Sequence, residues 1–274
     1  MRPVDSILVS GSPSATASIP TPRTDTLATV IVACCGQLEY TRLCVPSLLR
    51  FTRQPYELLF LDSDSRDGTV DYLDGLAAAA LVPVEVARVP ADPPVGSARR
   101  EDVIPIRGEY VALLNNDVIV TQGWLDGLIS LAASVPNAGM TAPMSNHGPQ
   151  SLRVENVPYG LEEYDPAGEA SAKAPSDNGP PRMPRSGLLP LIDKVNRFAS
   201  EWREKNAGQW FEADTLAGGC VVVKREVLRK MGLFPTRTPL GTFDMAALCQ
   251  RVQQAGFRLI GCRELFVHSF GSRG

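Results

Sequence analysis

Two short polar stretches, each placed directly after an apolar run, hold the side chains of this sequence that are best suited to chemistry. One begins at Asp62, after residues 56–61, and the other is residues 115–117, after residues 110–114. Ligands of open α/β sheets bind in the crevice outside the carboxyl ends of the strands, so we expect both stretches to face one crevice. Carboxylates there repel a phosphate, but they can bind a nucleoside or hold a cation that in turn holds a diphosphate. The two stretches together therefore predict a nucleotide-sugar site.

The first stretch is the candidate for binding the nucleoside, through Asp62, Ser63 and Asp64. A carboxylate accepts hydrogen bonds from an imino N–H and from ribose hydroxyls, which a nucleoside offers. A structural interpretation is also open, because Ser65 or Asp67 could cap the helix that is expected to follow. The two interpretations are compatible if later residues make the turn while Asp62 faces the crevice.

The second stretch supplies Asn116, a candidate contact for the nucleotide, and Asp117, the candidate metal ligand. Mg²⁺ and Mn²⁺ prefer oxygen ligands and often combine one or two protein carboxylates with substrate phosphates. One carboxylate and two amides are a small ligand set, so a diphosphate would have to complete it. The structural alternative is an Asx-turn at the strand end. His268 could add an imidazole ligand, or it could be a packed histidine beside aromatic residues.

Asp244 is the candidate general base. It lies in the first turn of the helix expected over residues 243–255, after a Gly/Pro-rich loop at residues 235–241. A carboxylate at that place could remove a proton from an incoming hydroxyl group. The alternative is a purely structural N-cap of the helix.

Composition excludes several other classes of protein. The 274 residues are 44% hydrophobic and 21% charged, as in an ordinary globular protein. The net charge of -3 and the lack of a basic stripe argue against a nucleic-acid partner. No apolar run reaches the roughly 18 residues of a membrane span, and no signal peptide is evident, so we expect a cytoplasmic protein. The 6 cysteines form no C-x-x-C pair and are expected to be reduced thiols.

The order of apolar runs predicts the secondary structure. Strands are expected at residues 29–33, 56–61, 81–89, 110–114, 139–142 and 216–223, with one or two more over 257–267, and helices at 38–51, 67–76, 97–104, 122–133, 188–205, from about 225, and at 243–255. Alternating strands and helices with short connections are typical of a three-layer α/β/α fold with a mainly parallel central sheet.

Three boundaries divide the chain. Residues 1–26 are expected to be a disordered leader, and residues 27–148 the nucleotide-binding half. A Pro/Gly/Ser-rich stretch predicts a mobile acceptor-side insertion within residues 149–213, followed by the acceptor and catalytic half at 214–274.

In their order and spacing, several sequence blocks resemble family 2 glycosyltransferases with the GT-A fold, over about residues 27–274. The blocks are Val30-Ile31-Val32, residues 37–42, Tyr56-Glu57-Leu58 leading to Asp62 and 65–69, residues 107–110 leading to 114–117 and 123–125, Gly219-Cys220 ahead of 224–228, and residues 268–273.

The resemblance implies a transferase that moves a sugar from a nucleotide-diphosphate donor to a glycan, lipid-linked or protein acceptor, with inversion, and a role in cell-envelope glycan biosynthesis. It implies that Asp62 helps to bind the nucleotide and that residues 115–117 stand at the D-x-D metal motif, with Asp117 the ligand. A divalent metal, Mn or Mg, would stabilise the leaving diphosphate while a carboxylate deprotonates the acceptor.

Three departures from the family pattern concern catalysis. The second acid of an acidic pair, usually taken as the base, is replaced by Met245, so only Asp244 could act. An aromatic residue that often stacks on the base is missing from residues 34–36, and an Arg-Asn pair reads Arg99-Arg100, of which Arg99 would still face the diphosphate. These changes leave open a degenerate domain that binds nucleotide sugar or glycan without turnover. A nucleotidyltransferase or a Rossmann dehydrogenase is disfavoured, because no G-x-G-x-x-G follows the first strand.

Overall fold

A computed structural model describes residues 26–53, 55–88, 106–159, 188–216, 219–231 and 244–271 of the chain. All but the last residue of the predicted leader, the predicted helix at 97–104 with Arg99, and residues 160–187 of the predicted insertion lie outside the described residues. Within the described residues, no helix combines the length and the apolar character that crossing a membrane requires.

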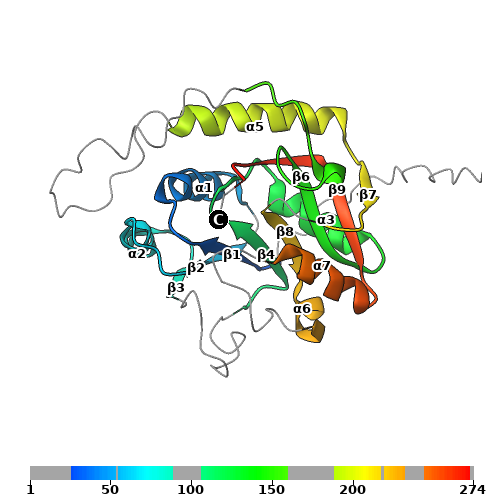
Figure 1. The fold of residues 1–274 in the computed structure, drawn as a ribbon, viewed down its shortest axis with the longest axis horizontal. Coiled ribbons are helices and arrows are strands. Elements are labelled where there is room, and N and C mark those ends of the chain that lie inside the picture. The colour runs from blue at the N-terminus through cyan, green and yellow to red at the C-terminus, as the bar shows by residue number, and fades with distance from the viewer. Residues whose placement is uncertain are drawn as a thin grey trace, which may run out of the picture.

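Strands and helices alternate along the chain (Figure 1). The strands are β1 (Ala28–Cys34), β2 (Tyr56–Asp62), β3 (Val84–Arg88), β4 (Tyr110–Asn115), β5 (Val118–Ile119), β6 (Ala138–Ser145), β7 (Trp210–Glu212), β8 (Cys220–Lys224) and β9 (Arg258–Ser269). The helices are α1 (Leu38–Phe51), α2 (Thr69–Ala79), α3 (Trp124–Ser134), the 3-10 turn η2 (Gln150–Leu152), α5 (Leu188–Lys205), α6 (Arg225–Met231) and α7 (Met245–Gln254).

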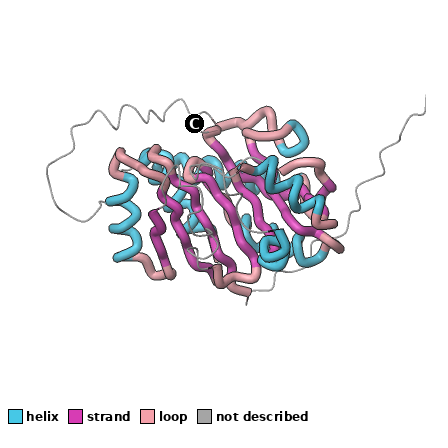
Figure 2. Tube along the Cα trace, turned by 60° about the horizontal axis from the view of Figure 1, so that its bottom comes forward, coloured by secondary structure: helices cyan, strands magenta, loops and turns pink. Residues whose placement is uncertain are grey.

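The described strands form one sheet in the order β3-β2-β1-β4-β8-β6-β9-β5, with β7 also paired to β9. Strands β3, β2, β1 and β4 are parallel to one another, and β6 is parallel to β9. Strand β8 runs antiparallel between β4 and β6. Figure 2 shows the strands side by side with helices on both faces, which confirms the predicted three layers.

Both faces of the central strands are buried, which explains why β1 and β2 are mostly apolar, with Thr29, Glu57 and Asp62 as the exceptions. Val30 and Val32 of β1 belong to the core cluster that includes Leu128 of α3. Ile31, which points to the opposite face, belongs to the cluster that includes Val195 of α5 and Leu248 of α7. A strand packed between two such layers is expected to be apolar, and every residue of β1 except Thr29 is.

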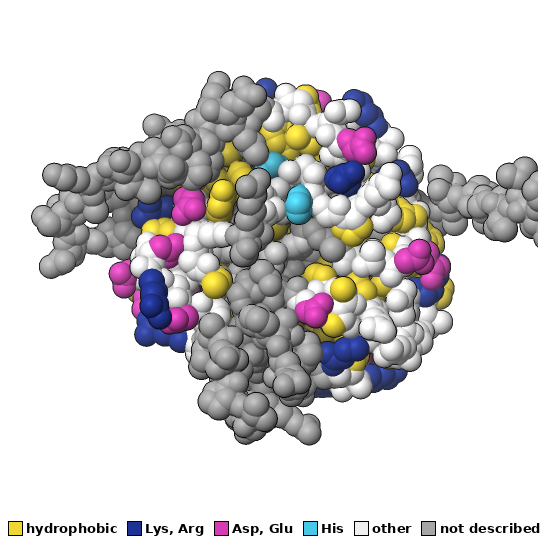
Figure 3. Space-filling view, viewed as in Figure 1, with side chains coloured by type: hydrophobic (Ala, Val, Ile, Leu, Met, Phe, Trp, Pro, Cys, Tyr) yellow, Lys and Arg dark blue, Asp and Glu magenta, His cyan; other side chains and the backbone are white. Residues whose placement is uncertain are grey.

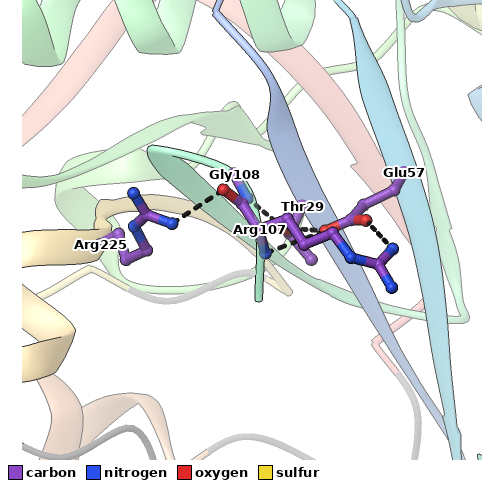
Figure 4. Close-up of polar contacts among 5 residues, drawn as sticks. All are labelled: Thr29, Glu57, Arg107, Gly108 and Arg225. Carbon is purple, nitrogen blue, oxygen red and sulfur yellow. Dashed lines mark hydrogen bonds and ion pairs between the residues drawn. The ribbon is translucent and has the colours of Figure 1, made fainter. Parts of the chain in front are cut away.

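A buried polar network joins the amino ends of β1, β2 and β4 (Figure 4). The Glu57 carboxylate accepts hydrogen bonds from the Thr29 hydroxyl at 2.7 Å, the Arg107 backbone N–H at 3.1 Å and the Arg107 guanidinium at 2.8 Å. The Thr29 hydroxyl oxygen accepts from the Gly108 N–H at 2.9 Å, and Arg225 donates to the Arg107 carbonyl at 2.8 Å. The blocks around Glu57, Arg107 and Arg225 therefore share a structural role at this end of the sheet.

Gly108 lies against the backbone of β1. A Cβ at this position would be 2.4 Å from the Thr29 nitrogen, closer than real Cβ atoms approach anything. The close approach is what lets the segment before β4 reach the network, so only glycine fits here.

The predicted helices at 38–51 and 188–205 have the predicted bounds. Strands β5 and β7 were not predicted, and β9 is a single strand, one of the two predicted alternatives for this segment. The predicted strand at 216–223 begins only at Cys220. All six cysteines are free thiols, five of them buried.

Candidate nucleotide and metal site

The two polar stretches end neighbouring strands on one edge of the sheet. Strand β1 lies between β2 and β4, and its register pairs Cys34 with Asp62 on one side and Ala33 with Asn115 on the other. Two steps of about 4.8 Å separate β2 from β4. The backbone therefore brings residues 62–64 and 115–117 to the same edge, as the sequence predicts.

Asp62 and Asp117 do not face an open crevice, however: they are only 3% and 1% exposed. The expectation of an open cleft is wrong for these side chains in this structure.

Asp62 and Ser63 leave buried polar atoms without partners. Oδ2 of Asp62 accepts a long hydrogen bond of 3.3 Å from the Ser65 N–H. Oδ1 of Asp62 and the Ser63 hydroxyl have no hydrogen-bond partner among the described residues. A buried polar atom without a partner costs about 1–3 kcal/mol, so both atoms fit a site that a ligand completes. Asp64 is exposed instead and pairs with Arg66 at 2.9 Å.

The structural interpretation of the turn after β2 also holds. Asp67 accepts from the Thr69 N–H at 3.1 Å, at the start of α2, and from the Leu38 N–H at 2.9 Å, at the start of α1. The Ser65 hydroxyl accepts from the Gly36 N–H at 2.6 Å. These bonds tie the loop after β1 to the loop after β2.

Hydrogen bonds also set the acidity of Asp67. Burial alone would raise its pKa, but hydrogen bonds from the Thr69 hydroxyl and from the N–H groups of Leu38 and Thr69 together hold the pKa below its ordinary value. Asp67 is therefore a structural carboxylate that stays ionised.

Asn116 binds the protein rather than open solvent. Its side-chain amide donates to the Gly36 carbonyl and to the Thr41 hydroxyl, both at 2.9 Å. Its backbone N–H donates to the Ala33 carbonyl at 3.1 Å. Both amide hydrogens of the side chain are thus in use, and Asn116 holds the turn after β4 against the start of α1.

The short pairing of β5 with β9 brings Asp117 near His268. Val118 lies opposite Ser269 and Ile119 opposite His268, in antiparallel register. Asp117 is therefore across from Phe270, whose N–H donates to the Asp117 carbonyl at 3.1 Å, and it lies on the diagonal from His268. Residues at the two candidate metal positions, far apart in sequence, thus lie on adjoining strands.

Tyr40, in the first turn of α1, lies near Phe270 and Asp117. Its ring packs on Phe270 with centroids 4.7 Å apart. Burial raises the pKa of Tyr40, and the charges of Glu39 and Asp117 raise it further. The Asp117 charge is therefore close enough to act on a ring of the first turn of α1.

His268 is fully buried among aromatic rings. Its Nδ1 is 3.0 Å from the Tyr159 hydroxyl oxygen, and its Nε2 has no hydrogen-bond partner among the described residues. Burial lowers the pKa of His268 to about 4, so the imidazole is neutral at pH 7, the form that binds a metal. Figure 3 shows the face of the molecule on which histidine atoms reach the surface beside apolar side chains, whereas His268 itself is 0% exposed.

Asn146 fixes the strand end that carries His268. Its amide donates to the Ser269 carbonyl at 2.9 Å, and its carbonyl oxygen accepts from the Ser269 N–H at 2.8 Å. These two bonds extend the β6–β9 pairing by one residue through a side chain.

Within the described residues, no three His, Cys, Asp or Glu side chains gather closely enough to hold a metal ion. Asp117 and His268 supply two protein groups, so waters or substrate oxygens would have to complete the coordination. Mg²⁺ and Mn²⁺ sites commonly take this form, and the buried Nε2 of His268 fits such an ion.

Asp244 is the N-cap of α7. Its carboxylate accepts from the Ala247 N–H at 2.9 Å, and the side chain is exposed. No acidic residue stands in the first turn of α7, and Met245 packs against the core. The capping alternative is therefore observed, and a role as base stays a prediction, as does the role of Arg99.

Sequence reasoning missed Tyr159, Asn146 and Tyr40 at this corner. Tyr40 lies in the block of residues 37–42 but was given no role there, and neither Asn146 nor Tyr159 belongs to a block that points to chemistry. They could be found only through the tertiary contacts of β9, since their partners are Phe270, His268 and Ser269.

Comparisons with known proteins bear on the family and the fold. Residues 29–155 match the model of glycosyl transferase family 2. The mannosyltransferase PcManGT from Pyrobaculum calidifontis, solved with GDP-Man and Mn²⁺, is 16% identical with a TM-score of 0.58, and the match covers 96% of this chain and 62% of that one. GalNAc-T7, solved with UDP, GalNAc and Mn²⁺, is 15% identical with a TM-score of 0.56, and the match covers 90% and 44%.

This chain thus spans less than two thirds of either solved protein. The comparison with curated proteins found no match. The chain has the GT-A fold of glycosyltransferases, and the match of residues 29–155 to the model of glycosyl transferase family 2 agrees with the resemblance seen in the sequence.

Proposed function

We propose that this chain transfers a sugar from a nucleotide-diphosphate donor to a glycan, lipid-linked or protein acceptor, with a divalent metal. The observation that carries the proposal is the register of β2, β1 and β4, which aligns Asp62 with residues 115–117 on one sheet edge. Oδ1 of Asp62, buried and without a partner among the described residues, supports it, because a nucleoside N–H or hydroxyl would satisfy that oxygen.

Each residue then has a definite task. The Asp62 carboxylate accepts hydrogen bonds from the nucleoside, and the Ser63 hydroxyl donates one to it. Asp117 and His268 hold the ion, and Asn116 keeps the turn that carries Asp117 in place. A divalent ion bound there supplies charge stabilisation for the leaving diphosphate.

The first test measures donor binding and transfer with and without Mn²⁺. Donors linked to UDP and GDP are the starting panel, since the two solved structures contain these nucleotides. Asp117→Asn should lower Mn²⁺-dependent transfer by about 100-fold or more, because it removes a metal ligand. The matched control is Asp193→Asn, which breaks an exposed ion pair with Arg50 on α1 and should change nothing. Equal transfer by wild type and Asp117→Asn would refute the metal role, and no donor binding at all would refute the function.

A second function is binding of nucleotide sugar or glycan without turnover. The favouring observation is that Asp244 is engaged as an N-cap while Met245, which cannot accept a proton, follows it. Metal-dependent donor binding without any product would support this function. In that case Met245→Asp should raise transfer if the missing acid is the only defect, and no gain in a protein that still binds donor would argue against that explanation.

Inversion at the anomeric carbon, a part in cell-envelope glycan synthesis, a cytoplasmic location and the division at residues 148 and 213 remain predictions of this proposal. Product stereochemistry with a defined donor checks the first of them.

A further inference from the structure

Tyr159 contacts the candidate metal ligand from the side away from Nε2. Its hydroxyl oxygen lies 3.0 Å from Nδ1 of His268, and both side chains are buried. The two rings meet edge to face, with centroids 5.5 Å apart and planes at 67°. Tyr159 therefore contacts His268 in two ways, through its ring and through its hydroxyl oxygen.

The imidazole plane is held from two directions. Phe270 meets the His268 ring edge to face at 4.7 Å and 83°, and Tyr159 meets it from another side. Tyr159 is itself held against Phe198 of α5, with centroids 5.7 Å apart. The direction in which Nε2 points is thus set by packing, and the remaining freedom of the ring is which nitrogen carries the proton.

That proton decides whether His268 can bind a cation. A neutral imidazole carries one proton, and only the bare nitrogen can be a ligand. If the proton is on Nε2, a buried donor is left without an acceptor among the described residues. If it is on Nδ1, it can be donated to the Tyr159 oxygen, and Nε2 presents its lone pair.

We propose that Tyr159 is a positioning residue that accepts the Nδ1–H of His268 and so presents the bare Nε2 to a divalent cation shared with Asp117. The proposal rests on the proposed function only for the existence of the ion. Ligating histidines elsewhere are oriented by such an outer hydrogen bond, whose loss weakens metal binding by about 10- to 100-fold. A phenylalanine would keep the ring packing and lose only the acceptor, so Tyr159→Phe isolates the hydroxyl.

The experiment is a Mn²⁺ titration of the full chain, followed by the electron paramagnetic resonance of free Mn²⁺, with no donor or acceptor present. Tyr159→Phe should raise the Kd for Mn²⁺ about 10- to 100-fold. His268→Ala should raise it as well, and the double variant should bind no more weakly than His268→Ala alone, because the hydroxyl acts only through the imidazole. Tyr56→Phe is the matched control, since Tyr56 is a buried tyrosine at the opposite end of β2, and it should bind Mn²⁺ like wild type.

A second readout needs neither metal nor activity. The chain has 2 histidines, so the ¹⁵N signals of the imidazoles can be assigned with a His147→Gln variant. Wild type should show His268 protonated on Nδ1, and Tyr159→Phe should move the proton toward Nε2. A proton on Nε2 in wild type, an unchanged tautomer in Tyr159→Phe, or wild-type Mn²⁺ affinity in that variant would each overturn the proposal.

Failure of sugar transfer is a separate result. If the protein binds Mn²⁺ through His268 but forms no product, the proposed transferase activity is refuted and the positioning role of Tyr159 is retained. Absence of Mn²⁺ binding by wild type would overturn the positioning role, while metal-free transfer could still be measured.

Discussion

The two ends of the central sheet differ in whether a buried carboxylate has its hydrogen-bond partners among the described residues. At the amino ends of the strands, Glu57 is 6% exposed, and its carboxylate accepts from Thr29 and twice from Arg107 (Figure 4). At the carboxyl ends, Asp62 is 3% exposed, yet its Oδ1 has no hydrogen-bond partner among the described residues. Two carboxylates on one strand, equally buried, therefore differ in whether the protein satisfies them.

The difference separates structure from function without any reference to a family. A folded chain pairs nearly all of its buried polar atoms, so a satisfied network stabilises the fold and an unsatisfied one signals a group that waits for a ligand. Substitutions at the amino end should then change stability and spare binding, whereas those at the carboxyl end should change binding and spare stability.

Gly108→Ala should have the largest effect, and on stability alone. Its Cβ would lie 2.4 Å from the Thr29 nitrogen, so the backbone of β1 or of the segment before β4 has to move. We expect a loss of about 3 kcal/mol or more in the free energy of unfolding, measured by denaturant titration. Gly75→Ala, in the interior of α2, is the control and should be stabilising by about 0.5–1 kcal/mol. If Gly108→Ala were as stable as Gly75→Ala, the segment before β4 would not need this close approach to β1.

Glu57→Gln should come next. The amide keeps one acceptor but loses the charge that the Arg107 guanidinium approaches at 2.8 Å, and hydrogen bonds to charged groups contribute about 1.5–3 kcal/mol. Because the Arg107 side chain is 62% exposed, we expect the lower half of that range, with donor affinity unchanged. Glu85→Gln, on the exposed side of β3, should leave stability unchanged. Lost donor binding by Glu57→Gln at full stability would break the contrast between the two ends.

Asp62→Asn should show the reverse pattern. The substitution removes the charged group of the protein that would accept hydrogen bonds from the nucleoside. Donor affinity, measured by calorimetry, should therefore fall about 10- to 100-fold. The free energy of unfolding should stay the same or rise, since a neutral amide replaces a buried carboxylate whose Oδ1 has no hydrogen-bond partner among the described residues. A destabilised variant with normal donor affinity would mean that Asp62 is a structural carboxylate like Glu57.

How much of this could be read from the sequence depends on the range of the interactions. The end of β2 and the helix α1 follow from local patterns of apolar and turn residues, and the rule for parallel strands places residues 62–64 and 115–117 on one edge. Strand β7 was missed because three residues are too few for a pattern.

The rest of the site depends on pairings that no local pattern contains. Strand β8 enters antiparallel between β4 and β6, and β5 has only two residues, yet this short pairing sets His268 beside Asp117. The Tyr159 hydroxyl meets His268 across 109 positions of the chain. The burial of Asp62 and Asp117 likewise depends on the packing of distant segments, which is why an open crevice was expected instead.

Asp67 should give the smallest effect, and it tests where the boundary between the two ends lies. It is at the carboxyl edge but satisfied, with bonds to the first turns of both α1 and α2. Asp67→Ala should therefore behave like a change at the amino end and cost about 1 kcal/mol of stability, the usual value of a lost cap. Asp71→Ala, one turn further along the exposed face of α2, is the control and should cost less.

The pH dependence of stability tests whether the hydrogen bonds keep Asp67 ionised in the folded state. Because hydrogen bonds from Thr69 and Leu38 outweigh burial and lower the pKa of Asp67 in the folded state, its contribution is complete above the pKa of the unfolded chain, about 4, and is lost as the pH falls through the lower folded value. The difference in unfolding free energy between wild type and Asp67→Ala should then be constant from pH 5 to 7 and shrink below about pH 4. A difference that grows on acidification would show that the carboxylate is not held ionised by these bonds. A loss of donor affinity without loss of stability would move Asp67 into the ligand site beside Asp62.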